Sequence, residues 1–62
     1  MEWNFNRKDQ LGKALYDLLQ DKTIQEISVQ DIVDKAEVSR RTFYNHFADK
    51  YELSAYVFDR ID

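Results

Sequence analysis

The 62-residue chain contains no cysteine and no proline, and Gly12 is its single glycine. The missing cysteines exclude disulfide bonds and metal sites built on thiolates. The lack of proline and glycine disfavours a β-rich fold, because turns between strands depend on these residues. No apolar run approaches the roughly 20 residues of a membrane span, and the N-terminus lacks the apolar core of a signal peptide. We therefore expect an all-α, soluble, cytoplasmic protein.

The length allows one domain over residues 1–62. The net charge of -3 disfavours a protein that coats nucleic acid indiscriminately. The positive charge is nevertheless concentrated: residues 35–50 hold four bases and two acids, a balance of +2. The remainder holds five bases and ten acids, a balance of -5. The basic residues are thus placed in one segment rather than spread along the chain.

The first helix is predicted over about residues 6–21, with Asn6 as its N-cap. Its apolar residues recur with the period of an α-helix; they are Leu11, Ala14, Leu15, Leu18 and Leu19.

Two short helices are predicted next, over residues 29–36 and 40–47. Ser28 and Asp31 resemble a capping box at the start of the first, and Ser39 is the expected N-cap of the second. Only two residues besides the caps separate the two helices, so they must cross steeply.

The start of a fourth helix is predicted over residues 50–61, where Asp49 and Glu52 form a further capping box. Its apolar stripe is still continuing where the sequence stops. The stripe consists of Leu53, Tyr56, Val57 and Ile61.

Two short helices joined by a tight turn and supported by a longer first helix form a three-helix, homeodomain-like helix-turn-helix arrangement. In this arrangement the second short helix enters the major groove of DNA. Phe43 and Phe47 are four residues apart and are predicted to point inward with Val38. The side chains then predicted to project outward are Arg40, Arg41, Tyr44 and Asn45, with Thr42 and His46 at the margin.

These residue types suit the recognition of duplex DNA. An arginine fork fits guanine O6 and N7, an asparagine can pair with adenine, and a threonine can contact a thymine methyl group or a phosphate. Tyrosine and histidine can donate to phosphate oxygens. Lys50 is expected to face an anion with its own charge and with the amides at the N-terminus of its helix. The amides that follow Ser28, at the start of another helix, are expected to face an anion in the same way.

The segment "VSRRTFYNHFADKYEL" resembles the N-terminal DNA-binding domain of the TetR family of bacterial transcriptional regulators. The family shows V-S-x-x-T-x-Y-x-H-F-x-x-K-x-x-L at these positions, and the resemblance runs from about Leu11 to Val57. The segment "RRTFYNHF" also resembles the sequences of the branch of the family that includes activators of dihydroxyacetone kinase operons.

The resemblance implies a role for each matching position. Residues matching Arg40, Arg41 and Asn45 read bases in the family. Residues that hold the DNA backbone match Thr42, Tyr44, His46 and Lys50, and those that touch the adjoining strand match Ser28 and Gln30. The implied partner is double-stranded DNA with a palindromic operator, bound by a homodimer of the full-length protein.

The sequence departs from the family in two ways. The family has glycine in the turn where this chain has Glu37; if that position is left-handed, the departure costs about 1–2 kcal/mol and re-aims the recognition helix slightly. The C-terminal domain that binds ligand and forms the dimer is absent. We therefore expect a fragment or isolated domain, with a natural single-domain protein as the alternative. We expect it to be monomeric, to bind no ligand itself and not to associate with membranes.

The sequence also bears on two other classes of function. A small helical protein–protein interaction module could use the end of the last stripe, around Tyr56, Phe58 and Ile61. An enzyme is not expected, because no catalytic constellation is present. His46 has no cysteine or second histidine as a partner, so no metal or other cofactor is expected. By composition alone, Arg40 and Arg41 could simply form a solvated helix face.

Overall fold

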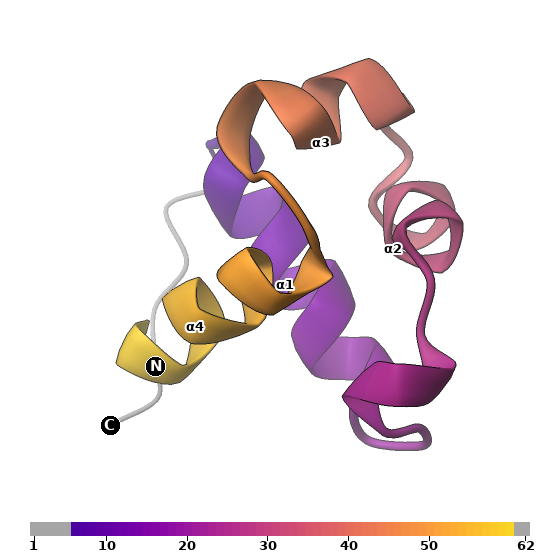
Figure 1. The fold of residues 1–62 in the computed structure, drawn as a ribbon. Helices are drawn as coiled ribbons and strands as arrows, with labels where there is room; N and C mark the ends of the chain where they lie inside the picture. Colours follow the sequence, from indigo (N-terminus) through magenta and orange to yellow (C-terminus); the bar gives the residue numbers. More distant parts are fainter. Residues whose placement is uncertain (1–5, 61–62) are drawn as a thin grey trace.

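The structure, a computed structural model, describes residues 6–60. The described residues form helices and no strands, so the all-α prediction is confirmed. The elements are α1 (Arg7–Leu18), the short 3-10 helix η1 (Ile24–Glu26), α2 (Val29–Ala36), α3 (Arg40–His46) and α4 (Lys50–Arg60). In Figure 1, α2 is seen almost end-on while α3 lies across the view, which confirms the steep crossing of the two short helices. None of these helices is long and apolar enough to span a membrane.

Each of the four α-helices begins with a side chain that accepts a hydrogen bond from the backbone N–H three residues later. Asn6 Oδ1 accepts from the N–H of Asp9 at 2.8 Å, and Ser39 Oγ accepts from the N–H of Thr42 at 3.1 Å. These bonds satisfy amides that have no partner within the helix. The predicted N-caps of α1 and α3 are therefore confirmed.

The expected capping boxes of α2 and α4 differ in detail. The box of α2 is complete, because Ser28 Oγ accepts from the N–H of Asp31 and Asp31 Oδ2 accepts from the N–H of Ser28, both at 3.0 Å. At α4, Asp49 Oδ1 accepts from the N–H of Glu52 at 2.8 Å. The Glu52 carboxylate, however, accepts from the N–H of Ala48 at 3.4 Å rather than from Asp49.

Helix α1 ends at Leu18 rather than near Asp21. The N–H groups of Asp21 and Lys22 both donate to the Leu18 carbonyl, at 3.1 and 3.0 Å, which closes a turn beyond the helix. The turn leads into η1, which the sequence analysis did not predict and which returns Ile24 to the side of the core and Ile27 to its interior. The earlier end follows from this return of apolar side chains to the core.

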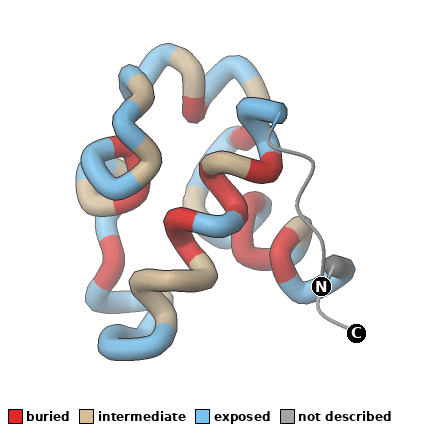
Figure 2. Tube along the Cα trace, turned by 180° about the vertical axis from the view of Figure 1, so that it is seen from behind, coloured by how far each residue is buried: buried red, intermediate tan, exposed pale blue. Residues whose placement is uncertain are grey.

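One cluster of buried apolar side chains joins all four α-helices, and buried positions interrupt exposed ones along them in Figure 2. Phe43 and Phe47 belong to this cluster, as their spacing predicted. Its members are Leu11, Ala14, Leu15, Ile27, Ile32, Val33, Phe43, Phe47, Leu53 and Val57.

A buried polar contact joins α4 to α1. Asp9 is only 1% exposed, and its Oδ1 accepts a hydrogen bond from the Tyr56 hydroxyl at 2.5 Å. The Lys8 ammonium lies 5.8 Å from the centre of the Tyr56 ring. Tyr56 therefore packs against the protein with its ring and closes the contact with its hydroxyl.

The turn between α2 and α3 contains the one non-glycine residue with positive φ among the described residues, Glu37, with φ 61° and ψ 42°. The N–H of Val38 donates to the Val33 carbonyl at 3.1 Å, and the N–H of Glu37 donates to the backbone carbonyl of Asp34 at 3.3 Å. This pair of bonds is a Schellman motif, in which glycine is the usual left-handed residue. The protein therefore holds a residue with a Cβ in a conformation that costs about 1 kcal/mol or more.

Glu37→Gly is expected to raise the free energy of unfolding by about 1 kcal/mol, because the relief of left-handed strain exceeds the added entropy of the unfolded chain. The corresponding rise in Tm is about 4–8 °C for a domain of this size. Urea and thermal unfolding followed by circular dichroism measure both quantities. The control is Lys35→Gly in the last turn of α2, which is expected to cost about 1 kcal/mol. A destabilised Glu37→Gly variant would contradict the strain described here.

The capping carboxylates also carry a dependence on pH. The hydrogen bond from the Ser28 N–H lowers the pKa of the Asp31 carboxyl below its usual value of 3.8. In η1, the hydrogen bond from the Thr23 N–H lowers the pKa of Glu26 below 4.5 in the same way. A lowered pKa means that the folded state favours the charged carboxylate. The carboxylate therefore contributes fully to stability when the pH is above the usual pKa, which is that of the unfolded chain. That contribution is lost as the pH falls through the lower folded-state value.

For Asp31→Asn, the loss of unfolding free energy relative to the parent chain is expected to be constant near neutral pH and to shrink below pH 3.8. The reason is that the parent loses the same charged cap when its carboxyl becomes protonated. Urea unfolding of both chains between about pH 7 and about pH 2 measures the difference. A difference that stays constant over the whole range would show that the charge of Asp31 plays no part in the cap.

Candidate nucleic-acid interface

Helix α3 has a buried side and an exposed side. Phe43 is fully buried, and Phe47, directly after the helix, is 5% exposed. The residues that face away from the core are exposed, and they are Arg40, Arg41, Tyr44 and Asn45. Thr42 and His46 are half-buried at the margin. The predicted orientation of α3 is therefore confirmed.

The central residues of the exposed side are not engaged elsewhere in the described part of the protein. No hydrogen bond or ion pair within residues 6–60 involves the side chains of Arg40, Arg41 or Asn45. Tyr44 packs edge-on against Phe43, with ring centres 5.1 Å apart and planes at 79°, and still remains 49% exposed. The arrangement presents two guanidinium groups, an amide and a phenol to solvent on one short helix.

The residues at the margin of α3 have contacts within the protein. The Thr42 hydroxyl lies 3.1 Å from Ser39 Oγ, next to the N-cap hydrogen bond. The His46 ring lies beside Phe47, with ring centres 6.4 Å apart. These contacts restrict both side chains and leave their outer edges as the accessible parts.

The N-terminus of α2 carries the second group of candidate residues. Ser28 is occupied by its reciprocal bonds with Asp31. The Gln30 side chain donates from Nε2 to Asp34 Oδ1 at 2.8 Å. Both side chains are exposed, so contact with a further ligand would exchange or extend existing hydrogen bonds.

Lys50, in the first turn of α4, lies against the segment that enters α2. Its Nζ donates to the Ile27 carbonyl at 2.7 Å and lies 3.4 Å from the Gln25 carbonyl. The structure thus brings Lys50 next to Ser28, which follows Ile27 directly. In this structure its ammonium group donates to two backbone carbonyls.

Sequence reasoning missed Lys22 as a neighbour of this region. The positive charges of Lys22 and Lys50 both help to lower the pKa of Asp31, after the larger effect of the Ser28 hydrogen bonds. Lys22 lies in the turn after α1, where no helical period or capping signal relates it to α2. Only the return of the chain through η1 brings it near.

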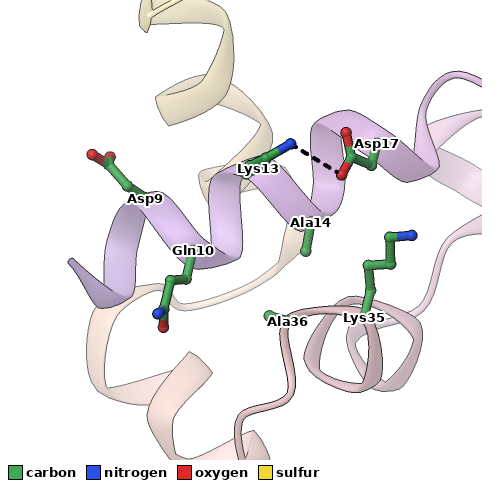
Figure 3. A pocket seen from close by; sticks show the side chains of 7 residues that line it. All are labelled: Asp9, Gln10, Lys13, Ala14, Asp17, Lys35 and Ala36. Atoms are coloured by element: carbon green, nitrogen blue, oxygen red, sulfur yellow. Dashed lines mark hydrogen bonds and ion pairs between the residues drawn. The ribbon is translucent and has the colours of Figure 1, made fainter. Parts of the chain in front are cut away.

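An open depression of about 240 Å³ lies between α1 and α2 (Figure 3). It is lined from α1 by Asp9, Gln10, Lys13, Ala14 and Asp17 and from α2 by Lys35 and Ala36, and Ala14 points toward α2 in Figure 3. Lys13 and Asp17 form an ion pair at 3.4 Å along its edge. Within residues 6–60, no group of three or more histidine, aspartate or glutamate side chains is placed to hold a metal ion. The depression is an open surface with side chains of both charges.

The surface considered for a protein partner is only partly present. Phe58 is 63% exposed, but Tyr56 is half-buried and donates its hydroxyl proton to Asp9. Ile61, the third residue of that surface, lies outside the described residues. The exposed apolar area on this part of α4 thus depends mainly on Phe58.

Comparison with known proteins gives a consistent result. The chain is 41% identical over 49 residues to the HTH-type dhaKLM operon transcriptional activator DhaS of Lactococcus lactis subsp. lactis (strain IL1403); this covers 79% of the chain and 26% of that protein. It is 41% identical over 44 residues to the uncharacterized HTH-type transcriptional regulator YxbF of Bacillus subtilis (strain 168), covering 71% of the chain and 12% of that protein. The chain therefore spans a small part of each relative. No solved structure gives a significant match.

The chain also matches the family described as bacterial regulatory proteins, tetR family, over residues 11–57. This range includes α2, α3 and the turn between them, together with most of α1 and α4. The chain belongs to the TetR family of bacterial regulatory proteins.

Proposed function

We propose that this domain binds double-stranded DNA in a sequence-specific manner by inserting α3 into the major groove, as the DNA-binding part of a transcriptional regulator. The observation that carries the proposal is the exposed side of α3, where Arg40, Arg41 and Asn45 have no partner among the described residues. A helix fits the width of the major groove, where each base pair presents a distinct pattern of donors and acceptors. The family membership of the chain supports the same role.

In this proposal, Arg40, Arg41 and Asn45 contact base edges. Each guanidinium group can donate two parallel hydrogen bonds to a guanine, and the asparagine amide can both donate to and accept from an adenine. All three residues are exposed on a helix that buried phenylalanines hold in place. A fixed helix favours base reading, since little backbone freedom remains to be lost on binding.

The residues around this centre are proposed to hold the DNA backbone. Tyr44 and His46 can donate to phosphate oxygens, and Thr42 can do so by exchanging its contact with Ser39. Ser28 and Gln30, at the N-terminus of α2, are proposed to contact the adjoining strand, where the helix dipole favours an anion. Contacts of this kind fix the orientation of the domain on the duplex and carry no sequence information directly.

The intact regulator is proposed to bind a palindromic operator as a homodimer, with half-sites about one helical turn apart. An isolated domain would contact one half-site and would lack the effective concentration that a linked second domain provides. Selection from random oligonucleotides, using the domain fused to a dimerising partner, tests this directly. Recovery of a palindrome supports the proposal, and recovery of no preferred sequence contradicts it.

Arg40→Ala and Arg41→Ala are each expected to weaken binding to the preferred duplex by about 1–3 kcal/mol if the arginine reads a guanine, and to relax the preference at one position. Tyr44→Phe is expected to weaken binding to all sequences alike, because it removes only a phosphate contact. Fluorescence anisotropy on preferred and altered duplexes measures both effects.

The matched control is Lys35→Ala, which removes one positive charge from the edge of the depression between α1 and α2 and is expected to change affinity little. The parent chain should lose affinity steeply as salt rises, because each neutralised phosphate releases counterions. If the Arg40, Arg41 and Tyr44 variants all bind like the parent, α3 is not the binding surface.

A further inference from the structure

Tyr56 of α4 contacts both the start of α1 and the residue that directly follows α3. Its hydroxyl donates to Asp9 Oδ1 at 2.5 Å, and the centre of its ring lies 5.5 Å from the centre of the Phe47 ring. Asp9 is only 1% exposed and Phe47 only 5%. Both partners of Tyr56 are therefore buried, and its side chain connects the beginning of one helix with the end of another.

Asp9 gives the Tyr56 hydroxyl a fixed point of attachment. It lies in the first turn of α1, and its backbone N–H donates to the N-cap oxygen of Asn6 at 2.8 Å. A hydrogen bond to a charged carboxylate is among the stronger kinds, and it costs more to lose inside the protein than at the surface. The bond therefore restricts where the Tyr56 ring can lie.

Phe47 connects the Tyr56 ring with the C-terminal end of α3. Its backbone is extended, with φ -139° and ψ 143°, and its N–H closes the last turn of α3 by donating to the Phe43 carbonyl at 2.9 Å. The ring of His46, the last residue of α3, lies 6.4 Å from the Phe47 ring, measured between centres. A displacement of the Phe47 ring would therefore move the surface against which His46 rests.

We propose that Tyr56 is a positioning residue for the DNA-binding surface: its bond to Asp9 holds its ring against Phe47, and Phe47 in turn sets the place of His46 at the end of α3. This inference rests on the proposed DNA-binding function, in which His46 donates to a phosphate. A side chain that is already held in place loses less freedom when it binds. Tyr56 thus contributes to binding without touching DNA.

A positioning role predicts a particular pattern of energetic coupling. Effects of mutations at residues that share a partner do not add, whereas those at distant, independent residues do. Tyr56 and His46 share Phe47 as a neighbour, and Arg40 lies at the opposite end of α3. The effect of Tyr56 on DNA binding should therefore couple to that of His46 and not to that of Arg40. A loss of stability alone produces no such difference.

The test compares Tyr56→Phe, which removes only the hydroxyl, with the parent chain on the preferred duplex. Affinity is measured by fluorescence anisotropy under conditions where NMR shows each chain to be folded. We expect Tyr56→Phe to bind about fivefold more weakly, within the range of coupling energies between contacting residues. The matched control is Tyr16→Phe, which should bind like the parent. Tyr16 also packs against the core, and its hydroxyl makes no hydrogen bond within residues 6–60.

Double-mutant cycles with His46→Ala and Arg40→Ala complete the test. In the His46→Ala background, Tyr56→Phe should weaken binding by less than about twofold, because the group that it positions is gone. In the Arg40→Ala background it should keep its full effect. Three results would each overturn the inference: parent affinity for Tyr56→Phe, an undiminished effect in the His46→Ala background, or equal coupling to Arg40 and His46. Should Tyr56→Phe fail to fold, the same cycles with Asp9→Asn, which weakens the acceptor and keeps the shape of the side chain, decide in the same way.

Failure of the proposed function gives a different result. In that case the parent chain shows no salt-dependent, sequence-specific binding, or the variants at Arg40 and Arg41 bind like the parent. The inference about Tyr56 falls with it. When the arginine variants lose affinity as expected, the proposed function stands, and the double-mutant cycles alone decide the role of Tyr56.

Discussion

The burial of Phe43 and Phe47 is the interaction on which the rest of the structure depends. Helix α3 has only seven residues, far fewer than an isolated helix needs for stability in water. Its conformation is held by the two phenylalanine rings, whose centres lie 6.0 Å apart, and by the contact of Phe47 with Tyr56 at 5.5 Å. Because these rings fix which side of α3 faces inward, they also fix which side chains face outward. The polar surface of α3 is a consequence of its apolar side.

The chain is acidic overall and still presents a basic surface, because several of its acidic side chains cap helices by accepting hydrogen bonds from backbone N–H groups. Asp31 and Asp49 accept hydrogen bonds from backbone N–H groups at helix starts, as does Glu26 at η1. Negative charge at a helix N-terminus is favourable for the helix dipole. Helix α3 is the exception, because a neutral serine caps it and no acid lies in its first turn. The one helix without acidic residues at its start is therefore the one that displays adjacent arginines.

The sequence predicted the parts of the fold that local chemistry decides. The observed start of α2 follows from the Ser28 cap, and that of α3 follows from the Ser39 cap. The outward side of α3 followed from the spacing of Phe43 and Phe47. The end of α1 did not follow in this way, because neither glycine nor proline marks it and the chain turns only to bring Ile27 back to the core.

Contacts between distant parts of the chain could not be predicted from the sequence. Lys50 was correctly placed in the first turn of α4, but its bond to the Ile27 carbonyl depends on how α4 packs against η1. A backbone carbonyl has no signature in sequence, so no pattern of residue types could have related the two positions. The same holds for the contact of Tyr56 with Asp9, which joins residues 47 positions apart. The candidate binding surface was thus predictable where it lies on one helix and unpredictable where several elements meet.

The local capping of every α-helix has a consequence for how the chain folds. Each capping hydrogen bond joins residues only three positions apart, so it can form before any contact between distant parts of the chain. Helical proteins dominated by such short-range contacts have low contact order and cross small entropic barriers. We therefore expect this domain to fold on the microsecond-to-millisecond timescale of such helical proteins, with the docking of α4 on α1 as the step that spans the greatest length of chain.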